Sequence, residues 1–192
     1  YFASGNYVSL VNPGSCIKGA TLYMGQSEGV VEPGEVINDA IMNIGGEEFG
    51  SYENHGPVND IQALSVSSNV YMFNIAIRLG GATYEEGQPL VMEDVGQTLD
   101  KMRSYFSRFG LGNVTGVDAP GEVSGYMLGN LPGMTLNYSI GQLDMYTPLQ
   151  LLQLCFGDCD IRQHVSDSPD GSTLPKATAK MSSKSIQSSL NR

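Results

Sequence analysis

An apolar segment without a polar side, residues 70–79, places the strongest constraint on the fold of this chain. Its large apolar residues occur nearly all round a helical wheel: Val70, Tyr71, Phe73, Ile75 and Ile77. A helix of this kind is stable only where neighbouring elements cover it. We therefore expect this helix to be buried and to end at Gly80-Gly81, where the pattern stops.

Four further segments favour helices: residues 15–24, 59–66, 93–109 and a segment that opens at Thr147-Pro148. The evidence is apolar spacing of three to four residues, a cap at Asn59-Asp60, and a proline at a first helical position. Gly25 and Gly29 are expected to loosen the end of the first of these helices. Residues 30–58 and 111–138 are rich in glycine or turn residues, so we expect irregular loops there.

With 192 residues, the chain is long enough for one domain with a core, or for part of a larger domain. Its formal net charge of −10 argues against nucleic acid and anionic membrane surfaces as partners, because both require clustered Lys and Arg. No apolar run approaches the roughly 20 residues of a membrane span. The sequence begins at Tyr1 rather than Met, which fits an extracytoplasmic protein without its targeting segment.

The three cysteines, Cys16, Cys155 and Cys159, are too few and too unevenly placed for a disulfide framework. A metal site at Cys155, Cys159 and His164 is disfavoured, because zinc takes four well-spaced ligands. We therefore expect neither a metal nor a cofactor. Residues 160–192 are rich in Ser, Lys, Thr and Asp and are expected to be disordered, because they hold few large apolar groups.

Ser15 and Lys18 form a Ser-x-x-Lys pattern at an expected helix start. Residues i and i+3 share a helix face, so the lysine amine can reach the serine hydroxyl. The field of a helix N-terminus favours a serine alkoxide and an oxyanion. Burial or a nearby cation lowers the pKa of a lysine, which allows it to act as a base. The alternative is a serine that caps a helix.

A second pattern, Ser67-Ser68-Asn69, lies between two expected apolar helices. In a catalytic interpretation, Ser67 relays a proton and Asn69 forms a hydrogen bond with a substrate carbonyl. In a structural interpretation, the segment caps a helix. Each of the two patterns is weak by itself, because both are common by chance.

Four segments in order carry a more specific signal: Asn12-Pro13-Gly14-Ser15-Cys16-Ile17-Lys18, residues 63–72 around Ser67-Ser68-Asn69, residues 109–122, and residues 139–151 with Ser139-Ile140-Gly141-Gln142 and Thr147-Pro148-Leu149-Gln150-Leu151. Together they resemble the penicillin-binding transpeptidases. The resemblance is closest to the monofunctional class B enzymes of Gram-positive bacteria.

The resemblance implies an α/β (α+β) serine acyl-transferase fold like that of β-lactamases, truncated to mainly its helical subdomain, with most of the sheet missing. Residues 1–153 are expected to be a partial transpeptidase domain. Residues 154–192 depart from the family pattern and are interpreted as an aberrant or disordered tail, which a shifted reading frame after Gln153 would explain. We expect the isolated chain to expose apolar surface and to be marginally stable.

The resemblance also implies a fragment of a peptidoglycan D,D-transpeptidase, which cross-links stem peptides through a serine acyl-enzyme and is acylated by penicillin. Ser15 would be the nucleophile and Lys18 its base, while Ser67 would relay the proton to the leaving group. Asn69 would hold the acyl side chain. The implied partners are stem peptides and β-lactams, and the full-length parent would be membrane-anchored at the extracytoplasmic face with cell-wall synthesis partners.

One family motif, Lys-Thr/Ser-Gly on a β-strand, is absent from the sequence, since none of the lysines has that context: Lys18, Lys101, Lys176, Lys180 and Lys184. That strand would bind the substrate carboxylate and complete the oxyanion hole, so this chain is expected to have little activity. The alternatives are a β-lactam-binding sensor, an inactive penicillin-binding relative, and a β-lactamase, for which no deacylating group is evident.

Overall fold

The computed structural model describes residues 5–118, 120–129 and 131–156. Its elements in chain order are η1 (Gly14–Ile17), α1 (Lys18–Ser27), β1 (Ile37–Asp39), β2 (Met42–Ile44), β3 (Glu47–Phe49), β4 (Gly56–Val58), α2 (Asp60–Ser65), α3 (Asn69–Leu79), α4 (Val95–Arg108) and α5 (Pro132–Ser139). Residues 148–156 are also helical. Of the predicted tail, residues 154–192, the first three continue this helix, whereas Cys159, His164 and the rest of 157–192 lie outside the described residues.

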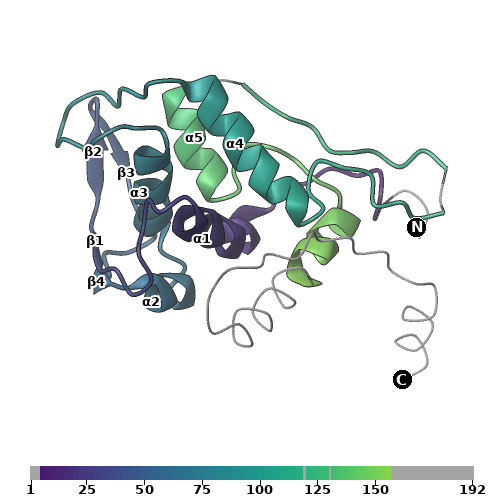
Figure 1. Ribbon diagram of the computed structural model, residues 1–192, viewed down its shortest axis with the longest axis horizontal. Helices are drawn as coiled ribbons and strands as arrows, with labels where there is room; N and C mark the ends of the chain where they lie inside the picture. The colour runs from purple at the N-terminus through teal and green to yellow at the C-terminus, as the bar shows by residue number, and fades with distance from the viewer. Residues whose placement is uncertain (1–4, 119, 130, 157–192) are drawn as a thin grey trace.

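The all-apolar segment forms helix α3, which lies between the strands and α1 (Figure 1). Helices α1 and α5 and strand β1 all pack against α3. Its buried residues come from every side of the helix: Val70, Tyr71, Met72, Phe73, Ile75, Ala76 and Ile77. The predicted burial is therefore confirmed.

The close approach of α1 to α3 depends on Gly25. A Cβ atom at this position would lie 2.8 Å from Cγ2 of Ile75 on α3, which is closer than van der Waals contact allows. The expectation that Gly25 loosens the helix is wrong, because α1 continues to Ser27 and Gly25 supplies the space for packing. Glycine at position 25 thus allows close packing, despite its low helix propensity.

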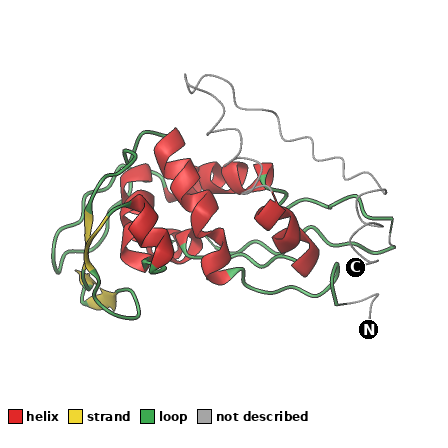
Figure 2. Ribbon diagram, turned by 90° about the horizontal axis from the view of Figure 1, so that it is seen from below, coloured by secondary structure: helices red, strands yellow, loops and turns green. Residues whose placement is uncertain are grey.

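Residues 30–58 are not wholly irregular as expected, since they contain four strands of three residues each. Strand β1 pairs with β4 and β2 pairs with β3, both antiparallel. Figure 2 shows the strands together at one end of the molecule, beside the helices. Strands this short do not complete an alternating pattern, which is why the sequence did not reveal them. Within the described residues, the fold is mainly helical with two small sheets.

The other helix predictions are largely confirmed. Helix α2 begins after Asn59, whose side chain forms a capping box with Gln62, and α4 begins after Asp94, which accepts a hydrogen bond from the Gln97 N–H. The predicted loop at 111–138 is wrong at its end, where α5 begins with a proline in its first turn. None of the helices in the described ranges is long and apolar enough to cross a membrane.

Candidate active site

The structure brings the four predicted site residues together, two from the turn into α1 and two from the junction of α2 and α3. The Lys18 ammonium donates to the Ser67 carbonyl oxygen at 2.6 Å, to Ser67 Oγ at 2.9 Å and to Asn69 Oδ1 at 2.7 Å. Ser67 Oγ donates in turn to Ser15 Oγ at 3.0 Å. A continuous chain of hydrogen bonds therefore connects the lysine amine with the exposed Ser15 hydroxyl.

The expected direct contact from Lys18 to Ser15 is replaced by a contact through Ser67. Ser15 lies in a 3₁₀ turn, and α1 begins only at Lys18. The lysine side chain, 3% exposed, turns inward to three oxygen atoms. These three acceptors match the three N–H donors of an ammonium group, which fixes the position of the amine.

Lys18 is buried without a carboxylate in direct contact among the described residues. Burial lowers the pKa of Lys18 to about 8, and the negative charge of Asp39 opposes this fall. At pKa 8, about one molecule in ten carries the neutral amine at pH 7. A lysine in this state can accept a proton at physiological pH.

Ser67 has an unusual backbone conformation. Its φ of 56° makes it the one non-glycine residue with positive φ in the part of the chain that the structure describes. This conformation is energetically costly for most residues, and here both the carbonyl and the hydroxyl of Ser67 reach the same lysine. Ser68 meanwhile caps α3 by accepting from the Tyr71 N–H. The predicted capping role thus belongs to Ser68, and Ser67 is left for the polar cluster.

Asn69 is held in one orientation by contacts on both sides of its amide. Its Nδ2 donates to the Gly50 carbonyl at 3.0 Å, while its Oδ1 accepts from Lys18. Its backbone N–H donates to Ser51 Oγ at 2.9 Å, and Ser51 Oγ donates to Asp39 Oδ2 at 2.8 Å. Sequence reasoning missed Asp39 and Ser51, because neither forms a recognisable spacing with the other site residues.

The stretch at the end of α5 packs directly on the turn that carries Ser15. The Gly14 N–H donates to the Gly141 carbonyl at 2.9 Å, and a Cβ on Gly141 would lie 2.3 Å from the Gly14 carbonyl oxygen. Thr21 of α1 donates to the Ser139 carbonyl at 2.8 Å. Glycine at position 141 is therefore required for this approach, with φ of 77°.

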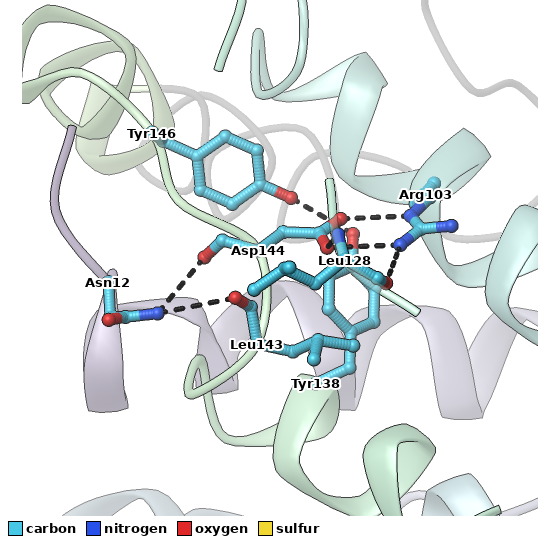
Figure 3. Close-up of polar contacts among 7 residues, drawn as sticks. All are labelled: Asn12, Arg103, Leu128, Tyr138, Leu143, Asp144 and Tyr146. Carbon is cyan, nitrogen blue, oxygen red and sulfur yellow. Dashed lines mark hydrogen bonds and ion pairs between the residues drawn. The ribbon is translucent and has the colours of Figure 1, made fainter. Parts of the chain in front are cut away.

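A second polar cluster contacts the chain segment that leads to Ser15 (Figure 3). The Asp144 carboxylate accepts from Arg103 Nε at 2.8 Å, from Arg103 Nη2 at 3.0 Å and from the Leu128 N–H at 2.9 Å. Arg103 also donates to the Leu128 carbonyl. Asn12, within the nucleophile segment, donates to the carbonyls of Leu143 and Asp144 at 3.4 and 3.5 Å. This cluster joins α4, the loop at 128 and the segment before Ser15.

Backbone hydrogen bonds continue this support. The N–H and carbonyl of Tyr146 pair with those of Val11, and the N–H and carbonyl of Met145 pair with those of Tyr126. The segment at 145–146 is thus bonded on both sides. The Arg103–Asp144 pair is therefore connected through hydrogen bonds to the chain segment that leads to Ser15.

No group of three or more His, Cys, Asp or Glu residues within the described ranges is placed to hold a metal ion. The arrangement instead offers a hydroxyl, a second hydroxyl and a buried amine in sequence. This set can perform proton transfer and nucleophilic attack.

Comparison with known proteins shows the family in which these motifs occur. The profile described as "Penicillin binding protein transpeptidase domain" matches residues 2–155. The chain belongs to this family. Among penicillin-binding relatives, proteins 2A and H of Bacillus subtilis (strain 168) are each 41% identical over 155 residues, which is 79% of this chain. The match covers 21% and 22% of those two proteins, so the chain spans about a fifth of their length.

Solved penicillin-binding proteins have the same fold. Penicillin-binding protein 2B of Streptococcus pneumoniae (strain 5204) matches with a TM-score of 0.73 and 30% identity, over 78% of this chain and 26% of the solved chain. PBP2 of Pseudomonas aeruginosa, solved in complex with WCK 5153, matches with a TM-score of 0.62 and 26% identity, over 77% and 33%. The predicted truncated penicillin-binding fold is therefore confirmed.

Proposed function

We propose that this chain is part of a peptidoglycan D,D-transpeptidase in which Ser15 forms an acyl-enzyme with a stem peptide and with penicillin. The observation that carries the proposal is the hydrogen-bond chain from Lys18 through Ser67 to Ser15. It joins a nucleophile to a buried amine whose pKa is lowered to about 8. Family membership supports a role in penicillin binding and peptidoglycan transpeptidation.

In the first step, the neutral Lys18 amine accepts a proton. Hydroxyl groups donate and accept, so the directions of both hydrogen bonds can reverse. The Ser15 proton passes to Ser67, and the Ser67 proton passes to Lys18, while Ser15 Oγ attacks the D-Ala-D-Ala carbonyl. Ser67 thus acts between the two groups, and Lys18 ends the step as an ammonium.

In the second step, the proton returns by way of Ser67 to the leaving amine as the peptide bond breaks. The acyl group remains on Ser15 until the amine of a neighbouring stem peptide attacks it, which forms the cross-link and frees the hydroxyl. Asn69 holds the acyl side chain with its second amide N–H, because the first is bound to Gly50. Acyl transfer by this route uses no cofactor.

The rate in this chain is expected to be low. The backbone N–H of Ser15 supplies one donor for the oxyanion, and the sequence contains no Lys-Thr/Ser-Gly strand motif for a second. Loss of one oxyanion donor typically costs about 10² to 10³ in rate. For the parent protein, we infer action on stem peptides at the extracytoplasmic face of the bacterial membrane, with β-lactams as inhibitors.

The proposal is tested by incubating the chain with excess penicillin G and measuring intact mass over hours, followed by peptide mapping. We expect a stable adduct on Ser15 that disappears in Ser15→Ala. Cys16 is an exposed thiol beside Ser15, so Cys16→Ser is the matched control and should keep the adduct.

An adduct that maps to Cys16, or no adduct after prolonged incubation, would contradict the proposal. Rapid release of hydrolysed penicillin would indicate a β-lactamase. Acyl transfer from a D-Ala-D-Ala peptide to an added amine separates a transpeptidase from a β-lactam sensor, which forms the adduct but transfers nothing.

A further inference from the structure

Asp39, at the end of β1, is a fully buried carboxylate close to the site, with 0% exposure. Its Oδ2 accepts from Ser51, while its Oδ1 has no hydrogen-bond partner among the described residues. None of the ion pairs within those residues includes Asp39. Burial of an unpaired carboxylate is costly, so the position requires a compensating role.

The hydrogen bonds of Asp39 lead directly to the site. Ser51 Oγ donates to Asp39 and accepts from the backbone N–H of Asn69 at 2.9 Å. The Asn69 side-chain oxygen accepts from Lys18 at 2.7 Å. Asp39 therefore lies at the inner end of a series of contacts that continues through Ser51, Asn69 and Lys18.

The charge of Asp39 also acts on Lys18, and it opposes the effect of burial on the lysine pKa. Other charged groups on the surrounding elements have partners of their own: Asp60 of α2 with Gln26, Arg78 of α3 with Glu35, and Lys101 of α4 with Glu28. In the loop before β4, His55 Nδ1 lies 3.7 Å from Glu53, and its Nε2 is buried without a hydrogen-bond partner among the described residues. Among the described residues, Asp39 is the acidic group whose negative charge raises the pKa of Lys18.

We propose that Asp39 is a positioning residue of the site. It holds Asn69 in place through Ser51, and its negative charge partly offsets the positive charge of Lys18. In the absence of this carboxylate, the buried amine would lose its proton more readily, so more of Lys18 would be neutral at a given pH but the amine would be a weaker base for the Ser15 proton. The chemical consequence rests on the proposed function, whereas the effect on Lys18 itself does not.

The experiment measures the Lys18 titration by NMR in the full chain labelled at the lysine side chains, with the resonance assigned by its loss in Lys18→Met. The variants are Asp39→Asn, which removes the charge and keeps a group able to bond Ser51, and Ser51→Ala, which breaks the contact and keeps the charge. Asp60→Asn is the matched control, because it removes a buried carboxylate that has its own partner in Gln26.

We expect the Lys18 pKa to fall below about 8 in Asp39→Asn and to stay near that value in Asp60→Asn and Ser51→Ala. A fall of half a unit raises the neutral fraction at pH 6 about threefold. In Asp39→Asn, the pH profile for acylation of Ser15 by penicillin should be displaced to lower pH, in parallel with the Lys18 pKa. Ser51→Ala should instead lower the rate without displacing the profile.

An unchanged Lys18 titration in Asp39→Asn, or an equal change in Asp60→Asn, would overturn the inference. If Asp39→Asn does not fold, the carboxyl carbon resonance of Asp39 in the unaltered chain decides the question. A protonated Asp39 at pH 7 excludes the proposed charge balance. If Ser15 is never acylated, the proposed function fails while the Lys18 titration still tests Asp39.

Discussion

Two basic residues, the buried Lys18 and the half-buried Arg103, have opposite electrostatic environments. Lys18 is bound by neutral oxygens, and burial lowers its pKa to about 8. Arg103 makes a two-pronged ion pair with Asp144, a carboxylate that is 1% exposed, and this pairing raises the pKa of Arg103 above its ordinary value. One site therefore holds a group that can change its charge, and the other holds a charge that is permanent.

The difference distinguishes a residue that can transfer a proton from a residue that stabilises the structure. A cation with a direct carboxylate partner keeps its proton and serves as a fixed link between segments. A buried amine without such a partner retains a proton only weakly and is able to exchange it. In this chain both arrangements contact the same nucleophile segment, since Asn12 donates to the Asp144 carbonyl and Lys18 is the last residue of the segment.

The largest expected effect is that of Lys18→Met on chemistry. Removal of a general base typically lowers a rate by about 10² to 10⁴, so acylation of Ser15 by penicillin should fall by about 10³. The matched control is Lys101→Met, because Lys101 is exposed and pairs with Glu28. Intact-mass time courses give both rates. Equal rates in Lys18→Met and the unaltered chain would show that Lys18 is not the base.

The next largest effect is expected for Arg103→Met on stability. The substitution leaves the Asp144 charge buried without its partner and should lower the free energy of unfolding by about 3 to 5 kcal/mol. Urea titrations followed by circular dichroism give the value, with Arg108→Met, on the exposed side of α4, as control. The double variant Arg103→Met, Asp144→Leu should recover much of the loss. A small effect of Arg103→Met alone would mean that the pair is not structural.

A smaller effect is expected in the pH dependence of stability. The folded pKa of Lys18, about 8, lies below the unfolded value of 10.5, so the unfolded chain binds more protons between these pH values. The free energy of unfolding should therefore rise from pH 8 to 9.5, by about 1 to 2 kcal/mol after allowance for solvent. Urea titrations of the unaltered chain and Lys18→Met should differ by this slope. Above pH 10 the effect is opposed by Tyr71 and Tyr105, because burial raises the pKa of each to about 12.

The smallest expected effect concerns Tyr138, beside the Arg103–Asp144 pair (Figure 3). Its hydroxyl lies 3.0 Å from that of Tyr146, and its ring centroid lies 5.7 Å from the Arg103 guanidinium carbon. Tyr138→Phe keeps the ring and leaves the Tyr146 hydroxyl without this partner, at a cost of about 1 kcal/mol. Tyr126→Phe, at an exposed position, should cost almost nothing. A neutral result for Tyr138→Phe in thermal unfolding would assign the support to the ion pair alone.

Local patterns in the sequence were sufficient to predict most of the helices. The burial of α3 follows from its apolar surface, and α2 and α4 begin at the residues where Asn59 and Asp94 can cap them. The motif residues Ser15, Lys18, Ser67 and Asn69 could be named from spacing and family likeness. The strands of three residues and the helix α5 were not predicted, because their sequence signals are shorter than the pattern needed to recognise them.

The sequence alone determined the nucleophile candidate, its family and the apolar helix α3, because these are recognised from short segments and from the order in which those segments follow one another along the chain. The tertiary structure decided that Ser67 stands between Lys18 and Ser15, that Asp39 lies behind Asn69, and that Arg103 pairs with Asp144. Lys18 and Ser67 are 49 positions apart, and Arg103 and Asp144 are 41 apart. Burial and charge pairing at such separations depend on how the helices pack, and that packing decides which of the two cations can lose its proton.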